Sequence, residues 1–165
     1  MVNNAELQYQ IEQFLYRNAS HCDHKNWKDY LNDFCEEMTF HVPQWKSEFE
    51  YTTNPKREMS LIYYANRGGL EDRIFRVETE KSSSAYPLPR TLHQLSNIRI
   101  VKIENDEVYI EAGWDTSYVR MEVVRRFFGL VNYRIKKQDE IFKITYKQVI
   151  LMNDKINAVL DFYHI

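Results

Sequence analysis

Residues 57–76 read REMSLIYYANRGGLEDRIFR, and the rest of the chain can be interpreted outward from them. The apolar and aromatic run from Met59 to Tyr64 predicts a strand. Asn66 to Gly69 then breaks it, and two adjacent glycines permit backbone angles that other residues avoid, so we expect a sharp turn there. After the turn, apolar residues recur at the i, i+4 and i+7 spacing of a short amphipathic helix: Leu70, Ile74 and Val77.

Five charged residues surround this turn and helix: Arg67, Glu71, Asp72, Arg73 and Arg76. We expect Glu71 and Asp72 in the first helical turn, where the helix dipole favours negative charge. One interpretation is a solvated helix face. The alternative is a contact surface, because arginine forks that pair with carboxylates are common at interfaces. Arg73 follows the acidic pair too closely to face it on a helix, so its partner should come from elsewhere.

The composition limits the class of protein. The chain has 165 residues, which predicts one domain over 1–165, and 15% of them are aromatic, which suggests large planar side chains in a core, pocket or interface. A net charge of −2 gives no support to nucleic-acid binding, and no run of about 20 apolar residues predicts a membrane helix. The start of the chain lacks signal-peptide order, and two cysteines are too few for a disulfide scaffold. We therefore expect a cytoplasmic protein.

The first half of the chain predicts two helices and a strand. Apolar residues at helical spacing predict a first helix over about 4–20, and Trp27, Tyr30, Leu31 and Phe34 predict the apolar face of a second, short one. Met38, Phe40 and Val42 alternate with polar residues as in a strand that Pro43 closes. Residues 44–56 have no period and are expected to form a loop.

The second half predicts antiparallel strands after a Ser- and Pro-rich connection over 78–89. From Leu92 the apolar phase shifts near Val101, which indicates either two covered faces or a bulge. Further strands are expected around Val108 to Trp114, Phe128 to Ile135 and 141–151, and the apolar end of the chain is expected to be tucked in. Helices followed by such a meander predict an α+β fold, with N-terminal helices packed on one face of a curved, mostly antiparallel sheet.

The possible metal ligands do not form a recognised site. Cys22-Asp23-His24 has the spacing of half a Rieske motif, but Cys35 is followed by Glu36, Glu37 and Met38, so the second half is missing. The five histidines include no pair at the i, i+4 or i+5 spacing that a helix would need. We therefore assign no metal-binding, cofactor-binding or catalytic residue in this chain, and interpret His21 to His24 as an ordinary helix end.

Four residues could act as acid or base if the fold enclosed a pocket: Asp33, His41, His93 and Asp115. His41 and Asp115 each lie on a predicted strand next to a large apolar residue, where the polar side chain faces away from the core. None of the four forms a convincing catalytic pair in the sequence. The simpler interpretation is that all four are structural or exposed.

The segment SLIYY followed by NRGGLEDR resembles the small (beta) subunits of aromatic-ring-hydroxylating dioxygenases, in particular the benzoate, toluate and anthranilate group. Residues 93–97 (HQLSN), Thr79-Glu80 and the ending from Asn153 to Ile165 extend the resemblance over essentially the whole chain. It implies the cystatin-like, nuclear-transport-factor-like cone fold. The resemblance also makes the five charged residues, together with Phe162, Tyr163 and Ile165, candidates for a subunit interface.

The resemblance further implies a division of labour. This chain would be the small, non-catalytic subunit of a terminal oxygenase, assembled as a trimer within a hexamer of three large and three small subunits. The large (alpha) subunit would carry a Rieske [2Fe–2S] cluster and a mononuclear Fe(II), with NADH electrons arriving through a separate reductase. The resemblance also implies that the pocket for the aromatic acid lies in the large subunit.

Two other functions remain open at this stage. One is a stand-alone isomerase or dehydratase of the same cone fold, which would need an enclosed pocket with a raised carboxylate or a His–Asp pair. The other is a non-enzymatic ligand-binding module of the same fold.

The first prediction is that the isolated chain binds no iron, because its possible ligands lack a complete motif. Metal analysis of the purified chain should give no stoichiometric iron. In the assembled oxygenase, Cys22→Ala and His24→Ala should leave the Rieske colour unchanged. Stoichiometric iron in the lone chain, or loss of colour in either variant, would contradict it.

Overall fold

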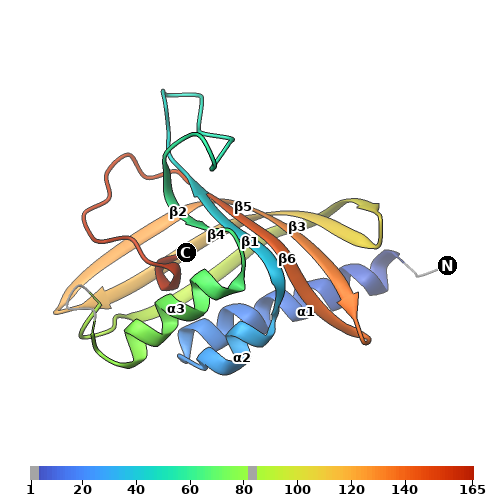
Figure 1. Ribbon diagram of the computed structural model, residues 1–165, viewed down its shortest axis with the longest axis horizontal. Coiled ribbons are helices and arrows are strands. Elements are labelled where there is room, and N and C mark those ends of the chain that lie inside the picture. Colours follow the sequence, from blue (N-terminus) through green and yellow to red (C-terminus); the bar gives the residue numbers. More distant parts are fainter. Residues whose placement is uncertain (1–3, 82–84) are drawn as a thin grey trace.

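The computed structural model describes residues 4–81 and 85–165, so Ser82 to Ser84 of the predicted connection lie outside the described residues. The described chain is built from three α-helices, six strands and one short 3-10 helix, which pack around one hydrophobic core (Figure 1). The elements are α1 (Asn4–Asp23), α2 (Trp27–Asn32), β1 (Phe34–Pro43), β2 (Ser60–Tyr64), α3 (Arg67–Glu78), β3 (Arg90–Glu104), β4 (Glu107–Arg120), β5 (Val123–Gln138), β6 (Ile141–Leu151) and η1 (Phe162–His164).

The strands form one six-stranded sheet in the order β2-β1-β6-β5-β4-β3. The β1–β6 pair is parallel and the other four pairs are antiparallel. All three helices lie on the same side of this strongly curved sheet (Figure 1). The predicted α+β fold, with helices on one face of a mostly antiparallel sheet, is therefore confirmed.

The two N-terminal helices differ from the prediction at their ends. α1 buries the expected stripe of Leu7, Ile11, Phe14 and Leu15, but it continues to Asp23 rather than ending at residue 20. Its last turn is held by tertiary contacts, because Cys22 is buried in the core. Phe34 was predicted on the second helix and instead begins β1, where it pairs with Ile144 of β6. Sequence periodicity does not detect such long-range pairing.

The predicted turn at Gly68-Gly69 is wrong in its detail. Both glycines lie inside the first turn of α3, and no glycine among the described residues has a positive φ. Asn66 caps the helix, with its side chain accepting a hydrogen bond from the Gly68 amide at 2.9 Å. Gly69 is needed for space, since a Cβ there would lie 2.9 Å from Cδ1 of Tyr64. Because α3 begins at Arg67, Glu71 and Asp72 fall beyond its first turn rather than within it.

The apolar phase shift in β3 reflects irregular pairing with β4, as one of the two sequence interpretations proposed. The register shifts between Ser96 and Arg99 and again between Ile100 and Lys102. Gln8 of α1 fastens this irregular edge, because its Nε2 donates to the Ile98 carbonyl at 2.7 Å and its Oε1 accepts from the Ile100 amide at 3.4 Å. A side chain from α1 thus satisfies backbone groups of an edge strand that would otherwise be open.

The end of the chain folds back into the core, which confirms the expectation of a tucked-in terminus. Phe162, Tyr163, His164 and Ile165 are each less than 5% exposed. Phe162 lies against the rings of Trp27 and Tyr30, with centroid separations of 5.3 and 6.1 Å. The segment therefore joins the core that α2 forms with the sheet.

An ion pair fixes this C-terminal segment to α3. The guanidinium of Arg73 donates to both carboxylate oxygens of Asp161, with Nε to oxygen distances of 3.0 and 2.9 Å. Asp161 is 3% exposed and also caps η1 by accepting from the Phe162 amide. The partner of Arg73 thus comes from elsewhere in the chain, 88 residues away, as the helix geometry required.

The second prediction concerns this pair. Arg73→Ala would leave the buried Asp161 carboxylate without its counter-charge, which should lower the free energy of unfolding by about 2–5 kcal/mol. Arg76→Ala, on the exposed face of the same helix, should cost less than about 1 kcal/mol. Urea unfolding of the isolated chain measures both variants. Equal, small losses would show that the Arg73–Asp161 pair does not hold the segment.

Candidate functional site

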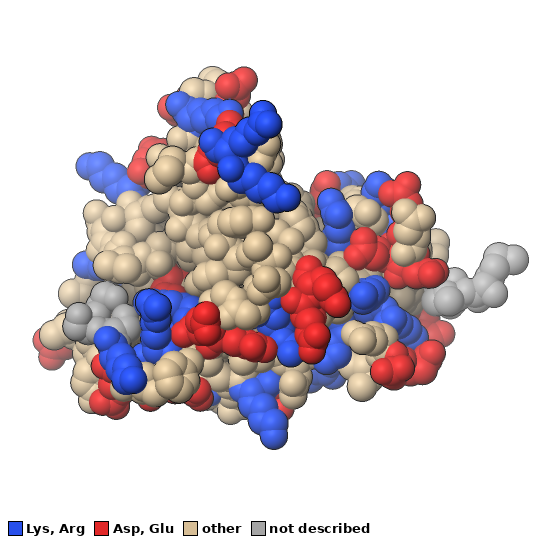
Figure 2. All heavy atoms as spheres, viewed as in Figure 1, with Lys and Arg blue, Asp and Glu red and all other residues tan. Residues whose placement is uncertain are grey.

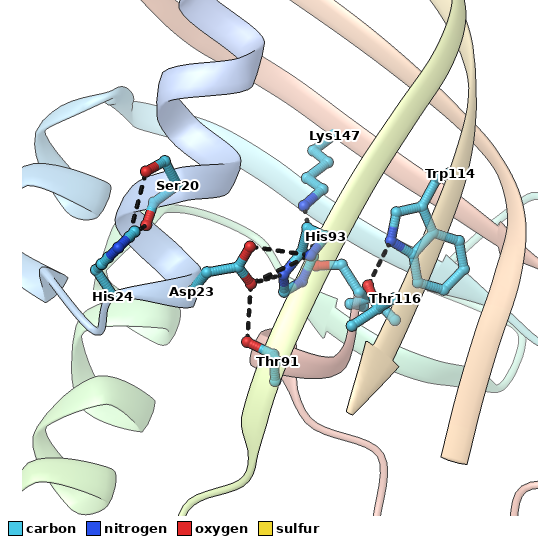
Figure 3. A network of polar contacts seen from close by, with 9 residues as sticks. Ser20, Asp23, His24, Thr91, His93, Trp114, Thr116 and Lys147 are labelled. Atoms are coloured by element: carbon cyan, nitrogen blue, oxygen red, sulfur yellow. Dashed lines mark hydrogen bonds and ion pairs between the residues drawn. The ribbon is translucent and has the colours of Figure 1, made fainter. Parts of the chain in front are cut away.

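A network of polar contacts on the helix-covered side of the sheet includes Asp23 and His93 (Figure 3). Asp23 is the last residue of α1, and His93 lies on the edge strand β3. The His93 Nδ1 lies 2.5 Å from Oδ1 of Asp23, and the His93 backbone amide donates to Oδ2 at 2.9 Å. Thr91 lies two residues before His93 on the same face of β3, and its hydroxyl donates to Asp23 at 2.8 Å. One carboxylate therefore binds three groups of β3.

These contacts fit a structural role for Asp23. Burial by itself would raise the pKa of Asp23, but its hydrogen bonds and charge interaction with His93 outweigh burial, so the pKa lies below the ordinary value. A carboxylate stabilised in its charged form is a weak base. Because the His93 amide and the Thr91 hydroxyl both belong to the edge strand, Asp23 closes that edge at one end of α1, as Gln8 does nearer the other.

Lys147 is a buried charged residue of the interior. Its Nζ donates to the main-chain oxygen of Ile165 at 3.2 Å and lies 5.1 Å from the Phe40 ring centroid and 5.9 Å from that of Tyr133. Burial lowers the pKa of Lys147 to about 8. The ammonium group thus holds the last residue of the C-terminal segment in place.

Little space is left between these groups. His93, Lys147, Tyr30, Cys22 and Ile165 contribute to the wall of a cavity of about 10 Å³. Such a volume holds about one water molecule and no organic substrate. Within the described part of the chain, the hydroxyl of Tyr30 and Nε2 of His93 are buried and have no hydrogen-bond partner. Both residues line this cavity.

His164 completes the closure of the interior. Its Nδ1 accepts a hydrogen bond from the Asp161 amide at 2.9 Å, and its ring packs 4.7 Å from that of Tyr118. The pKa of His164 is lowered to about 3, mainly by burial and to a smaller extent by nearby positive charges. The imidazole is therefore neutral at ordinary pH and acts as a packed, hydrogen-bonding ring.

The residues of the half Rieske motif point in different directions. Cys22 faces the interior, where burial raises the pKa of its thiol to about 12, so it is no ready thiolate ligand. Nδ1 of His24 lies 2.9 Å from the Ser20 main-chain oxygen on the surface. In residues 4–81 and 85–165, no three His, Cys, Asp or Glu side chains come together as metal ligands.

The remaining acid–base candidates are placed in separate structural contacts. Asp33 is buried, accepts from Asn18 at 3.1 Å, and burial raises its pKa. His41 lies 3.1 Å from the Ser60 hydroxyl across the β1–β2 pair, and burial lowers its pKa. Asp115 forms an ion pair with Arg126 on the opposite face of the sheet. The structure brings none of these three to His93.

The candidate interface residues fall into two groups. Around α3, acidic and basic side chains are interspersed rather than gathered into a patch of one sign (Figure 2). Arg67 pairs with Glu71 at 2.7 Å and donates to the Phe34 carbonyl, whereas Asp72 and Arg76 are exposed. Phe162, Tyr163 and Ile165 are buried within the chain itself, so in this conformation they can only support an interface from beneath.

Two features of the interior were not predicted from the sequence. Asp23 was not among the acid–base candidates, although it pairs with His93, which was one of them. Lys147 was not singled out either, although a lysine between Tyr146 and the apolar run Val149 to Leu151 could have marked a buried cation.

In addition, no helix of the described residues is long and apolar enough to cross a membrane.

The curved sheet, the helices packed on it and the filled interior define a cone-fold protein. Its interior polar groups bind the edge strand β3 and the C-terminal segment. A sequence model described as "Ring hydroxylating beta subunit" matches residues 17–158. The chain belongs to this family of ring-hydroxylating beta subunits, as its sequence motifs indicated.

Individual relatives agree with this assignment. The chain is 39% identical to the anthranilate 1,2-dioxygenase small subunit of Acinetobacter baylyi over 97% of this chain and 98% of the relative. It is 41% identical to the benzoate 1,2-dioxygenase subunit beta of the same organism, with 94% and 92% covered. The crystal structure of the benzoate 1,2-dioxygenase beta subunit from Burkholderia mallei matches with a TM-score of 0.80 and 34% identity, covering 100% of this chain and 99% of that one.

The predicted cone fold is also confirmed by a more distant structure. A putative scytalone dehydratase from Novosphingobium aromaticivorans matches with a TM-score of 0.70 over 94% of this chain and 92% of that one, at 13% identity. This likeness shows the fold alone. The stand-alone isomerase or dehydratase and the ligand-binding module are not favoured, because the family model matches residues 17–158 and the relatives named above are dioxygenase small subunits.

The third prediction follows from the buried Lys147. Because its pKa is about 8 in the folded state and 10.5 when unfolded, the unfolded chain binds more protons between these values, so this residue's contribution to stability rises with pH there. The difference in unfolding free energy between wild type and Lys147→Met should therefore shift in favour of wild type from pH 8 to pH 10.5, by on the order of 3 kcal/mol. Lys155→Met, which changes an exposed lysine, should show no such shift. A pH-independent difference for Lys147→Met would contradict the buried, depressed lysine.

Proposed function

We propose that this chain is the structural small subunit of a terminal oxygenase that dihydroxylates an aromatic carboxylate. The observation that carries the proposal is the near-complete alignment, at 39% and 41% identity, with small subunits named for anthranilate and benzoate 1,2-dioxygenases. A toluate 1,2-dioxygenase subunit beta from Pseudomonas putida, 37% identical, extends the substrate class to methylated benzoates. Which of these acids is used depends on the large subunit, which would hold the substrate.

The iron chemistry belongs, in this proposal, to a large alpha subunit. That subunit would carry the Rieske [2Fe–2S] cluster and the mononuclear Fe(II), and a separate reductase would deliver electrons from NADH. Support comes from the donor groups of the small subunit. Cys22 is a buried thiol, His24 is on the surface, and the described residues contain no cluster of metal-ligating side chains.

The assembly we propose contains three large and three small subunits, with each small subunit a single domain over 1–165, in the cytoplasm. The small subunits would meet around a threefold axis. Arg67, Glu71, Asp72 and Arg76 on and around α3 remain candidates for direct contacts, and Arg73, Phe162, Tyr163 and Ile165 for supporting them from within. The mixed charges around α3 are compatible with such a contact.

The fourth prediction tests this function with the co-expressed oxygenase. The complex of this chain with its cognate large subunit should have the mass of a hexamer in sedimentation and carry all of its iron in the large subunit. With reductase and NADH, it should consume O₂ when supplied with benzoate, toluate or anthranilate. The isolated small subunit should contain no iron and should consume no O₂ with these substrates. A small subunit that turned over substrate alone, or that never bound a large subunit, would contradict the proposed function.

A further inference from the structure

A hollow of about 330 Å³ opens at the end of the sheet where the chain turns from β4 into β5. One wall comes from these two strands, and the other comes from the C-terminal segment at Ala158 and Val159, which lies beside this hairpin (Figure 1). The volumes of small-molecule sites in proteins begin at about 300 Å³. Unlike the interior cavity beside Lys147, this hollow therefore has room for a small organic molecule.

Two arginines approach this hollow from neighbouring strands. Arg125 of β5 pairs directly with Tyr118 of β4, and Arg120 pairs in the same way with Val123. Paired residues share a face of the sheet, as do residues two apart on a strand, so Arg120 and Arg125 are diagonal neighbours on one face. It is the helix-covered face, because Tyr118 is 4% exposed and its ring packs against that of His164. Both guanidinium groups can therefore reach one ligand.

Each arginine is held by a main-chain carbonyl, which leaves its positive charge at the hollow. Nη2 of Arg120 donates to the Tyr86 oxygen at 2.7 Å, and Nη1 of Arg125 donates to the Asn157 oxygen. Among the described residues, no aspartate or glutamate lines the hollow. Burial is the main cause that lowers the pKa of His164, and the charges of Arg120 and Arg125 lower it further. The electrostatics of the hollow therefore favour an anion.

Two further groups of the wall can donate hydrogen bonds to an anion. The Tyr118 hydroxyl is buried and has no hydrogen-bond partner among the described residues. Nδ1 of His164 accepts from the Asp161 amide, so the neutral ring carries its proton on Nε2. Both side chains line the hollow. A buried hydroxyl without a partner costs free energy, and an acceptor atom on a ligand would remove that cost.

The rest of the wall is apolar and largely uncovered. Val123 is 49% exposed, Val159 is 62% exposed and Met121 is 75% exposed. All three line the hollow together with Ala158. An apolar ligand body would remove this surface from water, whereas inorganic phosphate would leave it hydrated. The combination of cations and apolar side chains therefore favours an anion that carries an apolar body.

We propose that this hollow binds a small organic carboxylate of the size of a one-ring aromatic acid. The carboxylate lies between the Arg120 and Arg125 guanidinium groups, where charge-assisted hydrogen bonds form, and the apolar body lies against Val123, Ala158 and Val159. A free acid is favoured over an acidic side chain of another protein, because the cations border a hollow of small-molecule volume. This site goes beyond the proposed function and is additional to the structural role of the subunit.

The test measures the binding of sodium benzoate to the full-length small subunit by isothermal titration calorimetry. The wild-type chain should bind one molecule saturably, with a dissociation constant on the order of 0.1–1 mM, as expected for so small a ligand. Benzamide has nearly the same shape without the charge, and acetate has the charge without the ring. Each should bind at least about 10-fold more weakly than benzoate.

Matched variants locate the site. Arg125→Gln should weaken benzoate binding at least about 10-fold, whereas Arg57→Gln, which changes an exposed loop arginine, should leave it unchanged. Val159→Glu adds a carboxylate at the hollow and should also weaken binding, whereas Val124→Glu on the opposite face of β5 should not. All four residues are exposed, so thermal unfolding should match wild type. In methyl NMR spectra, benzoate should shift the signals of Val123 and Val159.

Several results would overturn this site: no saturable binding by the wild-type chain, wild-type affinity in Arg125→Gln, or benzamide or acetate that binds as tightly as benzoate. If benzoate shifts the Val123 and Val159 signals in the isolated chain but not in the assembled oxygenase, a partner chain covers the hollow and the proposal is wrong. Each of these results leaves the proposed function intact, because assembly with the large subunit is measured separately. A chain that bound benzoate but never a large subunit would contradict the proposed function alone.

Discussion

The ion pair between Arg73 and Asp161 is the interaction on which the closed interior depends. It joins a helix from the middle of the chain to the segment at its end, and the same carboxylate caps η1. Once η1 is fixed, Phe162 packs against Trp27 and Tyr30, His164 packs against Tyr118, and Ile165 reaches the ammonium group of Lys147. Burying the Asp161 carboxylate, which is only 3% exposed, would cost free energy without the Arg73 guanidinium. The C-terminal segment can therefore take this position only when α3 is in place.

The space left between the sheet and the helices determines which functions the interior of the cone fold can have. The fold could enclose a pocket between sheet and helices, but here the C-terminal segment and large aromatic side chains leave about 10 Å³. The buried polar groups fasten the structure: Asp23 binds the edge strand β3 through His93 and Thr91, and Lys147 binds Ile165. The interior therefore supports a rigid sheet whose other face remains available. This agrees with membership of the family of ring-hydroxylating beta subunits.

Much of the fold follows from local sequence pattern. The parts that the pattern did not predict depend on contacts between residues far apart in the sequence. The apolar stripe Leu7, Ile11, Phe14 and Leu15 located α1, and the alternation from Val108 to Trp114 located part of β4. The start of β1 at Phe34 was missed because it depends on pairing with β6. The glycines were misread as a turn, because both lie within α3 and Gly69 is required for close packing against Tyr64. The Asp23–His93 pair joins residues 70 positions apart, and no periodicity reports such a contact. The buried end of the chain was expected from its apolar composition, but its arginine partner could only be inferred to lie elsewhere.

The central claim is that the interior polar pair is structural and that the chain supports the chemistry of a partner without taking part in it. Its most direct test is turnover of the reconstituted oxygenase carrying His93→Gln in the small subunit, with assembly and iron content measured on the same sample. Glutamine keeps a side-chain amide that can donate to Asp23 but cannot exchange protons as an imidazole does. Per assembled and iron-loaded complex, turnover and its pH profile should equal those of wild type. A fully assembled, iron-loaded complex with lost turnover or a shifted pH profile would show that His93 takes part in the reaction, and would contradict this account.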